Sequence, residues 1–359
     1  MLKAVLFDWG NTVMEELSDQ TGIMANWKKV AATPGIESAL KSVINGTKLC
    51  IATNAAESNS EQVRKALDRV GLATYFDNIF TSSELQSAKP QKDYFEHIAE
   101  VLEARFSELL MVGDSYSADA QGPAVLGLRA IWYRRNDTLF AHHHPFYDGE
   151  ITTLDDFPKS WEHIHHGHIP TILQSMRLMR EYGMPNKVLR HTQVVAMVGY
   201  VLARWLVDAG IEVDPIVVHR AGLLHDLDKA VWKQTSMKHG EASAEFIRAA
   251  GFHPLVSAIK RHQIFNILDA DLAPQSWVDK LVYLADKYSE KDQIVPVEAR
   301  VGHLSGRYPD SAQLLQSCLA PIHRLEQDIC KILLIEPHRL LENVTRVVSQ
   351  VDLTELHLD

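Results

Sequence analysis

The sequence predicts a two-domain protein in which an α/β domain with a doubly wound parallel sheet precedes an all-α domain. Over residues 1–135, short apolar segments of strand length alternate with stretches of helical periodicity, as in parallel sheets covered by helices. After Ile169 the helical pattern continues without strand-like segments. The total of 359 residues also exceeds the usual size of one domain, so two folding units are expected.

Five apolar segments in the first domain have the length and composition of strands. They cover residues 4–7, 48–52, 78–80, 109–112 and 129–132. Helices are predicted between them, at residues 35–44, 60–70 and 94–102. In a doubly wound sheet the chemistry takes place beyond the carboxyl ends of the strands. The polar residues that follow these strands are therefore the candidate site residues of this domain.

Residues 136–168 lack clear periodicity and are rich in histidine. The histidines are His142, His143, His144, His163, His165, His166 and His168. Clustered histidines can store metal, but no apolar framework fixes these side chains, so a solvated linker is the preferred interpretation. The sequence thus predicts a first domain at residues 1–135, a linker at 136–168 and a helical domain at 169–359.

Apolar residues of the second domain recur with the 3.6-residue period of amphipathic helices. Helices are predicted at residues 188–206, 241–250, 254–265, 276–288, 311–333 and 337–348. Asp214 and Pro215 are typical of an N-cap and a first helical residue, so a further helix is expected to begin there. Gly251 is expected just beyond the end of a helix.

Composition narrows the class of partner. The formal net charge is −10 and no basic run is long enough to follow a phosphate backbone, so nucleic acid is not expected as a partner. The three cysteines have neither metal-ligand spacing nor the numbers of a disulfide framework. No apolar segment is long enough for a signal peptide or a membrane span. We expect a soluble, cytoplasmic protein that binds a small molecule, with its oligomeric state left open.

A carboxylate, Asp8, directly follows the first predicted strand, and a flexible turn at residues 9–12 comes next. Further polar residues follow the later strands in a definite order. They are Thr53, Asn54, Lys89, Asp114 and Asp119. This ordered set resembles the haloacid dehalogenase superfamily over residues 1–135, which implies a haloacid dehalogenase-like fold. By that resemblance Asp8 is the nucleophile, and Thr53, Asn54 and Lys89 bind the phosphoryl group while Lys89 offsets its charge.

The resemblance also implies a Mg²⁺ site made by Asp8, Asp114 and Asp119, with the backbone carbonyl of Gly10 as a further ligand. Phosphatases of this superfamily carry a second aspartate where this sequence has Gly10. Losing a general acid–base lowers a rate by about 10²–10⁴-fold, so weak or absent activity is expected here. Residues 12–34 are too few for a large cap domain, which predicts a minimal cap and an open site.

The second domain contains histidines and aspartates beside apolar helical runs. They are His191, His225, Asp226, His239, His262 and Asp286. Each is expected at the inner edge of a helix, where unpaired charges are costly unless metal ions neutralise them. The order of these residues resembles the HD superfamily of metal-dependent phosphohydrolases, over about residues 190–300.

The resemblance implies two divalent metal ions, and imidazole and carboxylate ligands suit Fe, Mn, Co or Zn. One ion would be held by His191, His225, Asp226 and Asp286, and Asp226 would bridge to a second held by His239 and His262. Such a pair can activate water for attack on phosphorus. Lys229 either stabilises phosphate charge as a catalytic residue or is an ordinary surface lysine. Asp228 either orients a ligand histidine or is solvated, and the solvated interpretation is preferred.

Among HD proteins the segment is similar to small ones such as the symmetrical diadenosine tetraphosphate hydrolases. Those carry an arginine soon after the last metal aspartate, whereas here none occurs between Asp286 and Arg300. A nucleotide, a dinucleotide or another phosphate ester is therefore allowed as substrate. Two alternatives stay open: an HD-type di-iron oxygenase, and a non-catalytic protein that senses a ligand through both domains.

Overall fold

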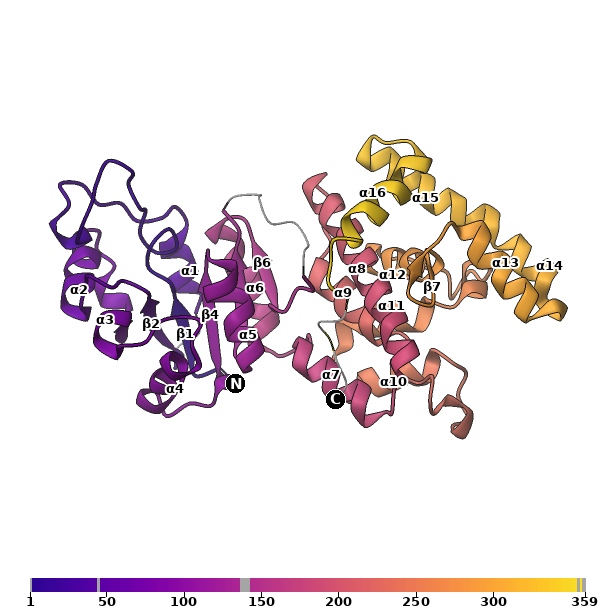
Figure 1. Ribbon diagram of the computed structural model, residues 1–359, viewed down its shortest axis with the longest axis horizontal. Helices are drawn as coiled ribbons and strands as arrows, with labels where there is room; N and C mark the ends of the chain where they lie inside the picture. Colours follow the sequence, from indigo (N-terminus) through magenta and orange to yellow (C-terminus); the bar gives the residue numbers. More distant parts are fainter. Residues whose placement is uncertain (1, 44–45, 136–142, 354–355, 357–359) are drawn as a thin grey trace. The chain divides into compact units, whose positions relative to one another are not determined.

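The computed structural model describes residues 2–43, 46–135, 143–353 and 356 (Figure 1). The chain forms two compact units. Unit 1 contains the described residues up to 135 together with Phe146–Gly167, and unit 2 contains residues 143–145 together with those from His168 onward. Among the described residues, no helix is long and apolar enough to cross a membrane.

Unit 1 is built on a six-stranded parallel sheet with the strand order β3-β2-β1-β4-β5-β6. Its strands are β1 (Ala4–Phe7), β2 (Lys48–Thr53), β3 (Asn78–Thr81), β4 (Leu109–Gly113), β5 (Arg129–Tyr133) and β6 (Gly149–Ile151). The predicted doubly wound α/β fold is confirmed, and the five predicted strands are all present within one residue at each end.

Helices cover both faces of this sheet. They are α1 (Ile36–Ser42), α2 (Ser60–Asp68), α3 (Ser82–Leu85), α4 (Lys92–Val101), α5 (Gly122–Leu126) and α6 (Phe157–His165). Val5 and Phe7 of β1 belong to one apolar core with α1, α2 and α6, whereas Ala4 and Leu6 belong to a second core with α4. Because successive side chains of a strand alternate between faces, the apolar run of β1 fills both cores.

The expected linker is wrong for residues 146–167, which form β6 and α6 of unit 1. Phe157 and Trp161 are buried in its core. The strand was missed because β6 is three residues long and has Glu150 at its centre. His144 is also fully buried, with Nδ1 3.0 Å from His219 Nε2 of unit 2. Residues 136–142, including His142, lie outside the described part of the chain.

The interval between β1 and α1 is fully described and contains one short helical turn, η1 (Met24–Asn26), and two isolated bridges. No cap domain is inserted there, as expected. The carboxyl ends of β1 and β4 consequently lack a large covering element from this interval.

The described part of unit 2 is helical apart from a hairpin of β7 (Ser289–Glu290) and β8 (Gln293–Ile294). Its helices are α7 (Ile172–Glu181), α8 (Asn186–Asp208), α9 (Pro215–Leu224), α10 (Glu241–Ala249), α11 (His253–Arg261), α12 (Trp277–Lys287), α13 (Val297–Arg307), α14 (Ala312–Ser317), α15 (Leu319–Leu333) and α16 (Pro337–Val348). Helices α7 and α13 were not predicted. The predicted helix at residues 311–333 is interrupted at Cys318, where Pro321 cannot donate to the preceding turn.

The contact between α8 and α9 positions the residues of the second candidate site. Asp214 caps α9 as predicted, since its Oδ1 accepts from the amides of Ile216 and Val217 at 2.8 and 3.3 Å. A Cβ at Gly222 would lie 2.8 Å from the Cα of Ala196 on α8, so only glycine permits this approach. Gly222 lies three residues before His225 and thus brings that histidine close to α8.

Candidate metal centres

The candidate residues of unit 1 gather at the carboxyl ends of the central strands. Asp8 follows β1, Thr53 ends β2, and Asp114 follows β4. Lys89 is 5% exposed and donates from Nζ to Asp8 Oδ1 at 2.8 Å and to Asp119 Oδ1 at 2.6 Å. The lysine therefore neutralises part of the negative charge of these carboxylates.

The side chain of Asn54 holds the backbone of Lys89 by two hydrogen bonds. The amide Nδ2 donates to the carbonyl of Lys89 at 2.9 Å, and the amide of Lys89 donates to Asn54 Oδ1 at 2.8 Å. Thr53 is buried, and its hydroxyl accepts from the amide of Ala55 at 3.2 Å. Thr53 and Asn54 thus both lie at the carboxyl end of β2, where Asn54 is bonded to the backbone of Lys89.

Asp8, Asp114 and Asp119 each offer an oxygen within 4.8 Å of the others. Burial and the neighbouring charge of Asp8 raise the pKa of Asp114 to about 6 and that of Asp119 to about 7, the latter against the opposing charge of Lys89. Carboxylates that repel one another in this way are stabilised by a hard cation, and oxygen ligands suit Mg²⁺. The residues of unit 1 therefore fit the metal that the resemblance implies.

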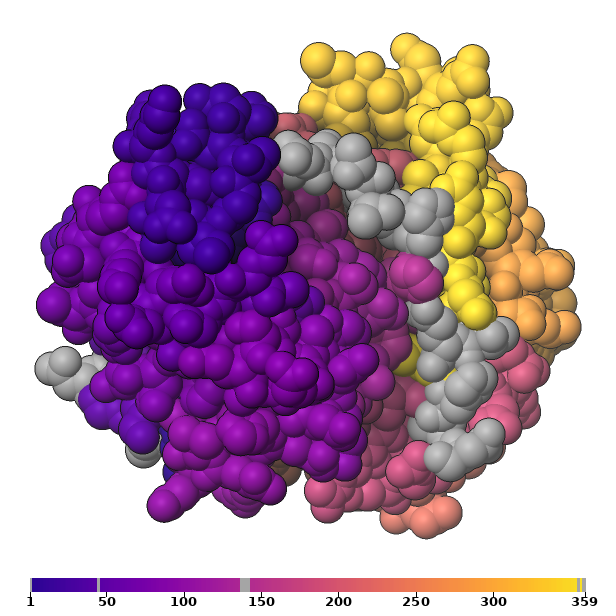
Figure 2. All heavy atoms as spheres, turned by 60° about the vertical axis from the view of Figure 1, so that its left-hand side comes forward, coloured from indigo at the N-terminus to yellow at the C-terminus, as the bar shows by residue number. Residues whose placement is uncertain are grey.

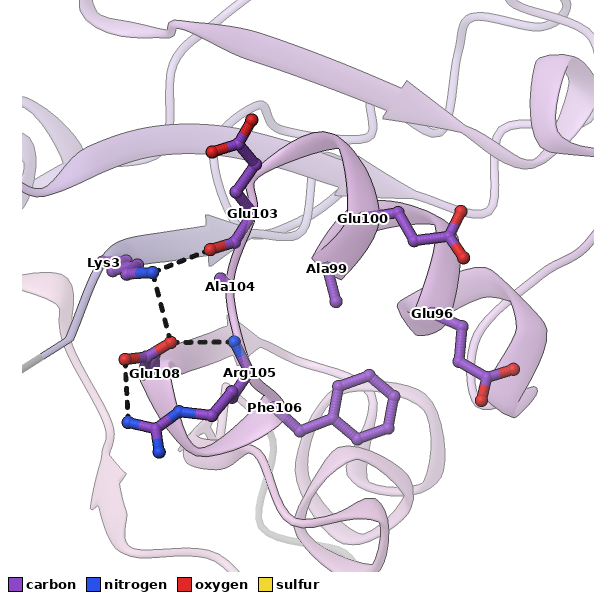
Figure 3. A pocket seen from close by; sticks show the side chains of 9 residues that line it. All are labelled: Lys3, Glu96, Ala99, Glu100, Glu103, Ala104, Arg105, Phe106 and Glu108. Atoms are coloured by element: carbon purple, nitrogen blue, oxygen red, sulfur yellow. Dashed lines mark hydrogen bonds and ion pairs between the residues drawn. The ribbon is translucent and has the colours of Figure 1, made fainter.

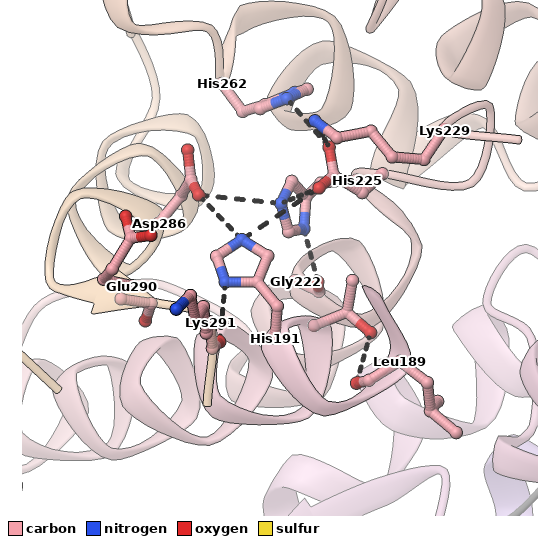
Figure 4. A network of polar contacts seen from close by, with 12 residues as sticks. Leu189, His191, Gly222, His225, Lys229, His262, Asp286, Glu290 and Lys291 are labelled. Atoms are coloured by element: carbon pink, nitrogen blue, oxygen red, sulfur yellow. Dashed lines mark hydrogen bonds and ion pairs between the residues drawn. The ribbon is translucent and has the colours of Figure 1, made fainter. Parts of the chain in front are cut away.

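Five segments contribute the candidate residues of unit 2. His191 lies on α8, and His225 and Asp226 follow α9 directly. His239 precedes α10, His262 ends α11, and Asp286 lies on α12. Figure 4 shows the imidazoles of His191 and His225 directed toward the carboxylate of Asp286. The six side chains that the sequence analysis selected are thus brought together.

The two oxygens of Asp226 face different histidines. Asp226 Oδ2 lies 3.6 Å from His225 Nε2 and 4.0 Å from His191 Nε2. Asp226 Oδ1 lies 3.1 Å from His239 Nε2 and 3.7 Å from His262 Nε2. Two groups with metal-ligand proximity therefore share this aspartate.

Asp286 lies on one side of Asp226 only. Its Oδ1 is 3.0 Å from His191 Nε2 and 3.8 Å from His225 Nε2. It therefore lies with the first of the two groups.

Each of the four imidazoles is held from behind at Nδ1, which leaves Nε2 directed at the carboxylates. The Nδ1 atoms of His191, His225 and His262 donate to the carbonyls of Lys291, Gly222 and Ile259 at 3.1, 2.7 and 2.6 Å, and that of His239 donates to Asp228 Oδ1 at 2.6 Å. Such bonds fix the tautomer and ring orientation that a metal ligand needs.

Asp228 is fully buried, so the expectation that it is solvated was wrong. Besides His239, its carboxylate accepts from the amides of Gly240 at 2.8 Å and Ser243 at 3.3 Å. These bonds lower the pKa of Asp228 although burial opposes them. The residue orients His239 and was misjudged because its partners follow it in sequence by 11 to 15 positions.

Electrostatics favour ionised carboxylates, and burial lowers the pKa of the His225 and His262 imidazoles, whereas the pKa of His239 is raised to about 9 because its hydrogen bonds to Asp226 and Asp228 outweigh burial. Burial alone would raise the pKa of Asp226, but the charges of His225 and Lys229 and the hydrogen bond from His239 hold it well below its usual value. Burial lowers the pKa of His262 to about 3. The Nε2 of His225 is buried and has no hydrogen-bond partner among the described residues. These features fit divalent metal ions, which need lone pairs and negative charge.

Several cations border this site. Lys229 Nζ lies 3.2 Å from Asp226 Oδ1 and 2.8 Å from His239 Nε2, and its side chain is 40% exposed. Arg300 of α13 places a guanidinium nitrogen 3.6 Å from Asp286 Oδ1. The sequence analysis did not select Arg300 as a site residue because α13, which brings it back to Asp286, was not predicted.

A separate pocket in unit 1 lies at the amino ends of the strands, opposite the carboxylate cluster (Figure 3). Lys3 and Glu108, which line it, precede β1 and β4 and pair with each other at 3.4 Å. Asp8 and Asp114 lie at the other ends of these strands. This pocket is therefore distinct from the carboxylate cluster.

Comparisons with known proteins also distinguish an N-terminal and a C-terminal domain. Residues 7–133 match the family model "Haloacid dehalogenase-like hydrolase", and residues 188–291 match the family model "HD domain". The chain therefore combines two classes of domain, one haloacid dehalogenase-like and one of the HD type. It consists of an N-terminal haloacid dehalogenase-like domain fused to a C-terminal HD domain.

Each of two curated relatives matches about a third of this chain. Pyrimidine 5'-nucleotidase YjjG of Escherichia coli is 38% identical over 111 residues, which are 31% of this chain and 45% of that protein. Ribonuclease Y of Clostridium kluyveri is 34% identical over 127 residues, 35% of this chain and 23% of that protein. The chain thus spans less than half the length of these relatives. A solved structure from Listeria monocytogenes is 26% identical, with a TM-score of 0.41, and covers 46% of this chain and 99% of its own.

Proposed function

We propose that this protein is a metal-dependent phosphohydrolase that cleaves a phosphate ester or anhydride of a nucleotide at a two-metal centre in its HD domain. The observation that carries this proposal is the position of Asp226, whose two oxygens face separate pairs of histidines. A shared carboxylate between two ligand groups is what a bimetallic site requires. Both named relatives, a nucleotidase and a ribonuclease, support a substrate with a nucleotide phosphate.

Two divalent cations, when bound, would polarise a phosphoryl oxygen and supply hydroxide at neutral pH. His191, His225, Asp226 and Asp286 would hold one, and His239, His262 and Asp226 the other. The ligand chemistry admits Fe, Mn, Co or Zn.

Cationic side chains at the edge of this centre would bind the substrate phosphate. Lys229 is partly exposed and next to His239, so its ammonium can pair with a phosphoryl oxygen as the substrate enters. Arg300 is 13% exposed and lies beside Asp286, where its charge offsets that of the carboxylate. The proximity of these two cations to Asp226 and Asp286 supports a phosphate-binding role.

In unit 1 we infer that Asp8 is a nucleophile toward phosphorus, that Asp8, Asp114 and Asp119 hold Mg²⁺ together with the carbonyl of Gly10, and that Lys89 offsets the charge. The short distances from Lys89 to Asp8 and Asp119 support this inference. Since Gly10 itself cannot transfer a proton, we assign the main activity to the HD domain. We also propose that the first domain extends from the N-terminus to about residue 167, because β6 and α6 complete its core.

The experiment is metal analysis of the purified protein, followed by hydrolysis assays on a panel of mononucleotides and dinucleotides. Asp226→Asn should lose both metal ions and nucleotide hydrolysis. Asp310→Asn, an exposed exchange of the same type, is the matched control and should behave as the wild type. Full metal occupancy in Asp226→Asn would contradict the bridging role. Oxygen consumption with an iron-loaded protein, in place of phosphate release, would favour the oxygenase alternative.

A further inference from the structure

Gly10 leaves a space beside Asp8 that another side chain fills. A Cβ built on Gly10 would lie 2.3 Å from Glu16 Oε1 and 3.0 Å from Glu16 Cδ. The carboxylate of Glu16 therefore occupies the place where a side chain of residue 10 would begin. Position 10 thus has no carboxylate of its own, and that of Glu16 lies in the space beside it.

The loop after β1 brings Glu16 back over Gly10. Gly10 and Met14 form a bridge, and the amide of Asn11 donates to the carbonyl of Met14 at 2.7 Å. Asn11 then orients Glu16 from both sides, because Oδ1 accepts from the Glu16 amide at 3.2 Å and Nδ2 donates to Glu16 Oε2 at 3.3 Å. Arg135 fixes Asn11 by donating to its backbone and side-chain oxygens at 3.0 and 3.1 Å.

Glu16 also lies close enough to act electrostatically on the carboxylate cluster. After burial and Asp8, the charge of Glu16 is a further cause of the raised pKa of Asp114. Glu16 is itself exposed, so water and a leaving alcohol can reach it. The indigo part of the chain, which contains this loop, lies at the surface in Figure 2. The carboxyl group of Glu16 thus lies against Gly10, two residues after the proposed nucleophile, and is open to solvent.

We propose that Glu16 is the general acid–base of the N-terminal site, which gives this domain a phosphomonoesterase activity toward aliphatic phosphate esters. This rests on the proposed nucleophilic role of Asp8. Asp8 attacks phosphorus, the bond from phosphorus to the ester oxygen breaks, and that oxygen keeps the electron pair and takes the proton of Glu16. The Glu16 carboxylate then takes a proton from water as the water oxygen attacks phosphorus. The bond to Asp8 breaks, and phosphate leaves.

The test compares two leaving groups in the full chain. All variants carry Asp226→Asn, so that the HD site is silent, and Mg²⁺ is present. p-Nitrophenyl phosphate releases a stable anion that needs little protonation, whereas β-glycerophosphate releases an alkoxide that needs it fully. Glu16→Gln should keep the rapid first release of p-nitrophenolate but lose about 10²-fold or more in phosphorylation by β-glycerophosphate.

A second readout is independent of turnover. Because the glutamine cannot activate water for the second step, phosphorylated Asp8 should accumulate with p-nitrophenyl phosphate and be visible in the intact mass. Glu61→Gln is the matched control, since Glu61 is an exposed glutamate of α2 that pairs with Lys65 and takes no part in holding Glu16. It should keep the parental dependence on leaving group and accumulate no phosphoenzyme.

Three results would overturn the proposal. Glu16→Gln could be phosphorylated by β-glycerophosphate at the parental rate, or its rate of phosphorylation could fall by the same factor with both esters, as a structural defect would cause. The parent could also phosphorylate no ester at all, and then the role of Asp8 fails as well. Asp8→Asn separates these cases, because it abolishes phosphorylation whenever Asp8 is the nucleophile, whatever Glu16 does.

Discussion

Asp228→Asn is a sharp probe of the metal centre in unit 2 because it preserves shape and removes one acceptor oxygen. The carboxylate accepts from His239 Nδ1 at 2.6 Å with one oxygen and from the Gly240 amide at 2.8 Å with the other. An asparagine can accept from only one of these donors. Its NH₂ group faces the other donor and cannot accept from it, so one hydrogen bond is lost. A hydrogen bond to a charged group contributes about 1.5–3 kcal/mol.

At about 1.4 kcal/mol for each factor of ten, this loss corresponds to roughly a 10- to 100-fold weaker binding of metal. The effect should fall on the ion held by His239 and His262, since Asp228 contacts neither His191 nor Asp286 in the described hydrogen bonds.

The assay is calorimetric titration of the metal-stripped protein with Zn²⁺ or Mn²⁺, together with the melting temperature of the metal-free variant. One affinity should fall and the other should stay, while the variant remains folded. Asp310→Asn serves again as the control. Unchanged affinities at both sites would refute the role of Asp228, and equal losses at both would show that the two sites are not separable as described.

Two further predictions concern the metal ligands and the extent of the first domain. His191→Ala should lose metal and have a lower melting temperature, since it leaves Asp286 without its 3.0 Å partner, whereas His262→Ala should keep one ion and the fold but lose most hydrolysis. Metal stoichiometry, melting curves and nucleotide assays on the two variants side by side check this prediction. Wild-type turnover by His262→Ala would exclude a two-metal mechanism. A chain of residues 1–167 should be folded, whereas one of residues 1–135 should not. The shorter chain lacks several core side chains of β6 and α6, whose burial contributes about 1.5–3 kcal/mol each to a total stability that is usually about 5–15 kcal/mol. Thermal melting followed by circular dichroism measures this, and equal melting temperatures of the two chains would contradict the extended boundary.

Most elements of both units could be predicted because they depend on local patterns, although β6, α6, α7 and α13 were not. Apolar runs such as Ala4–Phe7 and the helical period of α8 are readable within a short window of sequence. The candidate site residues followed from the same patterns, since Asp8 comes directly after a strand and His225 directly after an apolar helix. What could not be predicted locally was β6, whose three residues gain their stability from pairing with β5.

The sequence by itself determined which residues are available for chemistry: two groups of ionisable side chains, each next to buried apolar segments, and a glycine at position 10. Only the tertiary structure decided how they are used. It turned the two oxygens of Asp226 toward different histidines, buried Asp228 behind His239, and brought Glu16 over Gly10. Each of these depends on where a chain segment returns after a turn or a helix, and that path is set by packing between distant residues rather than by neighbours in sequence.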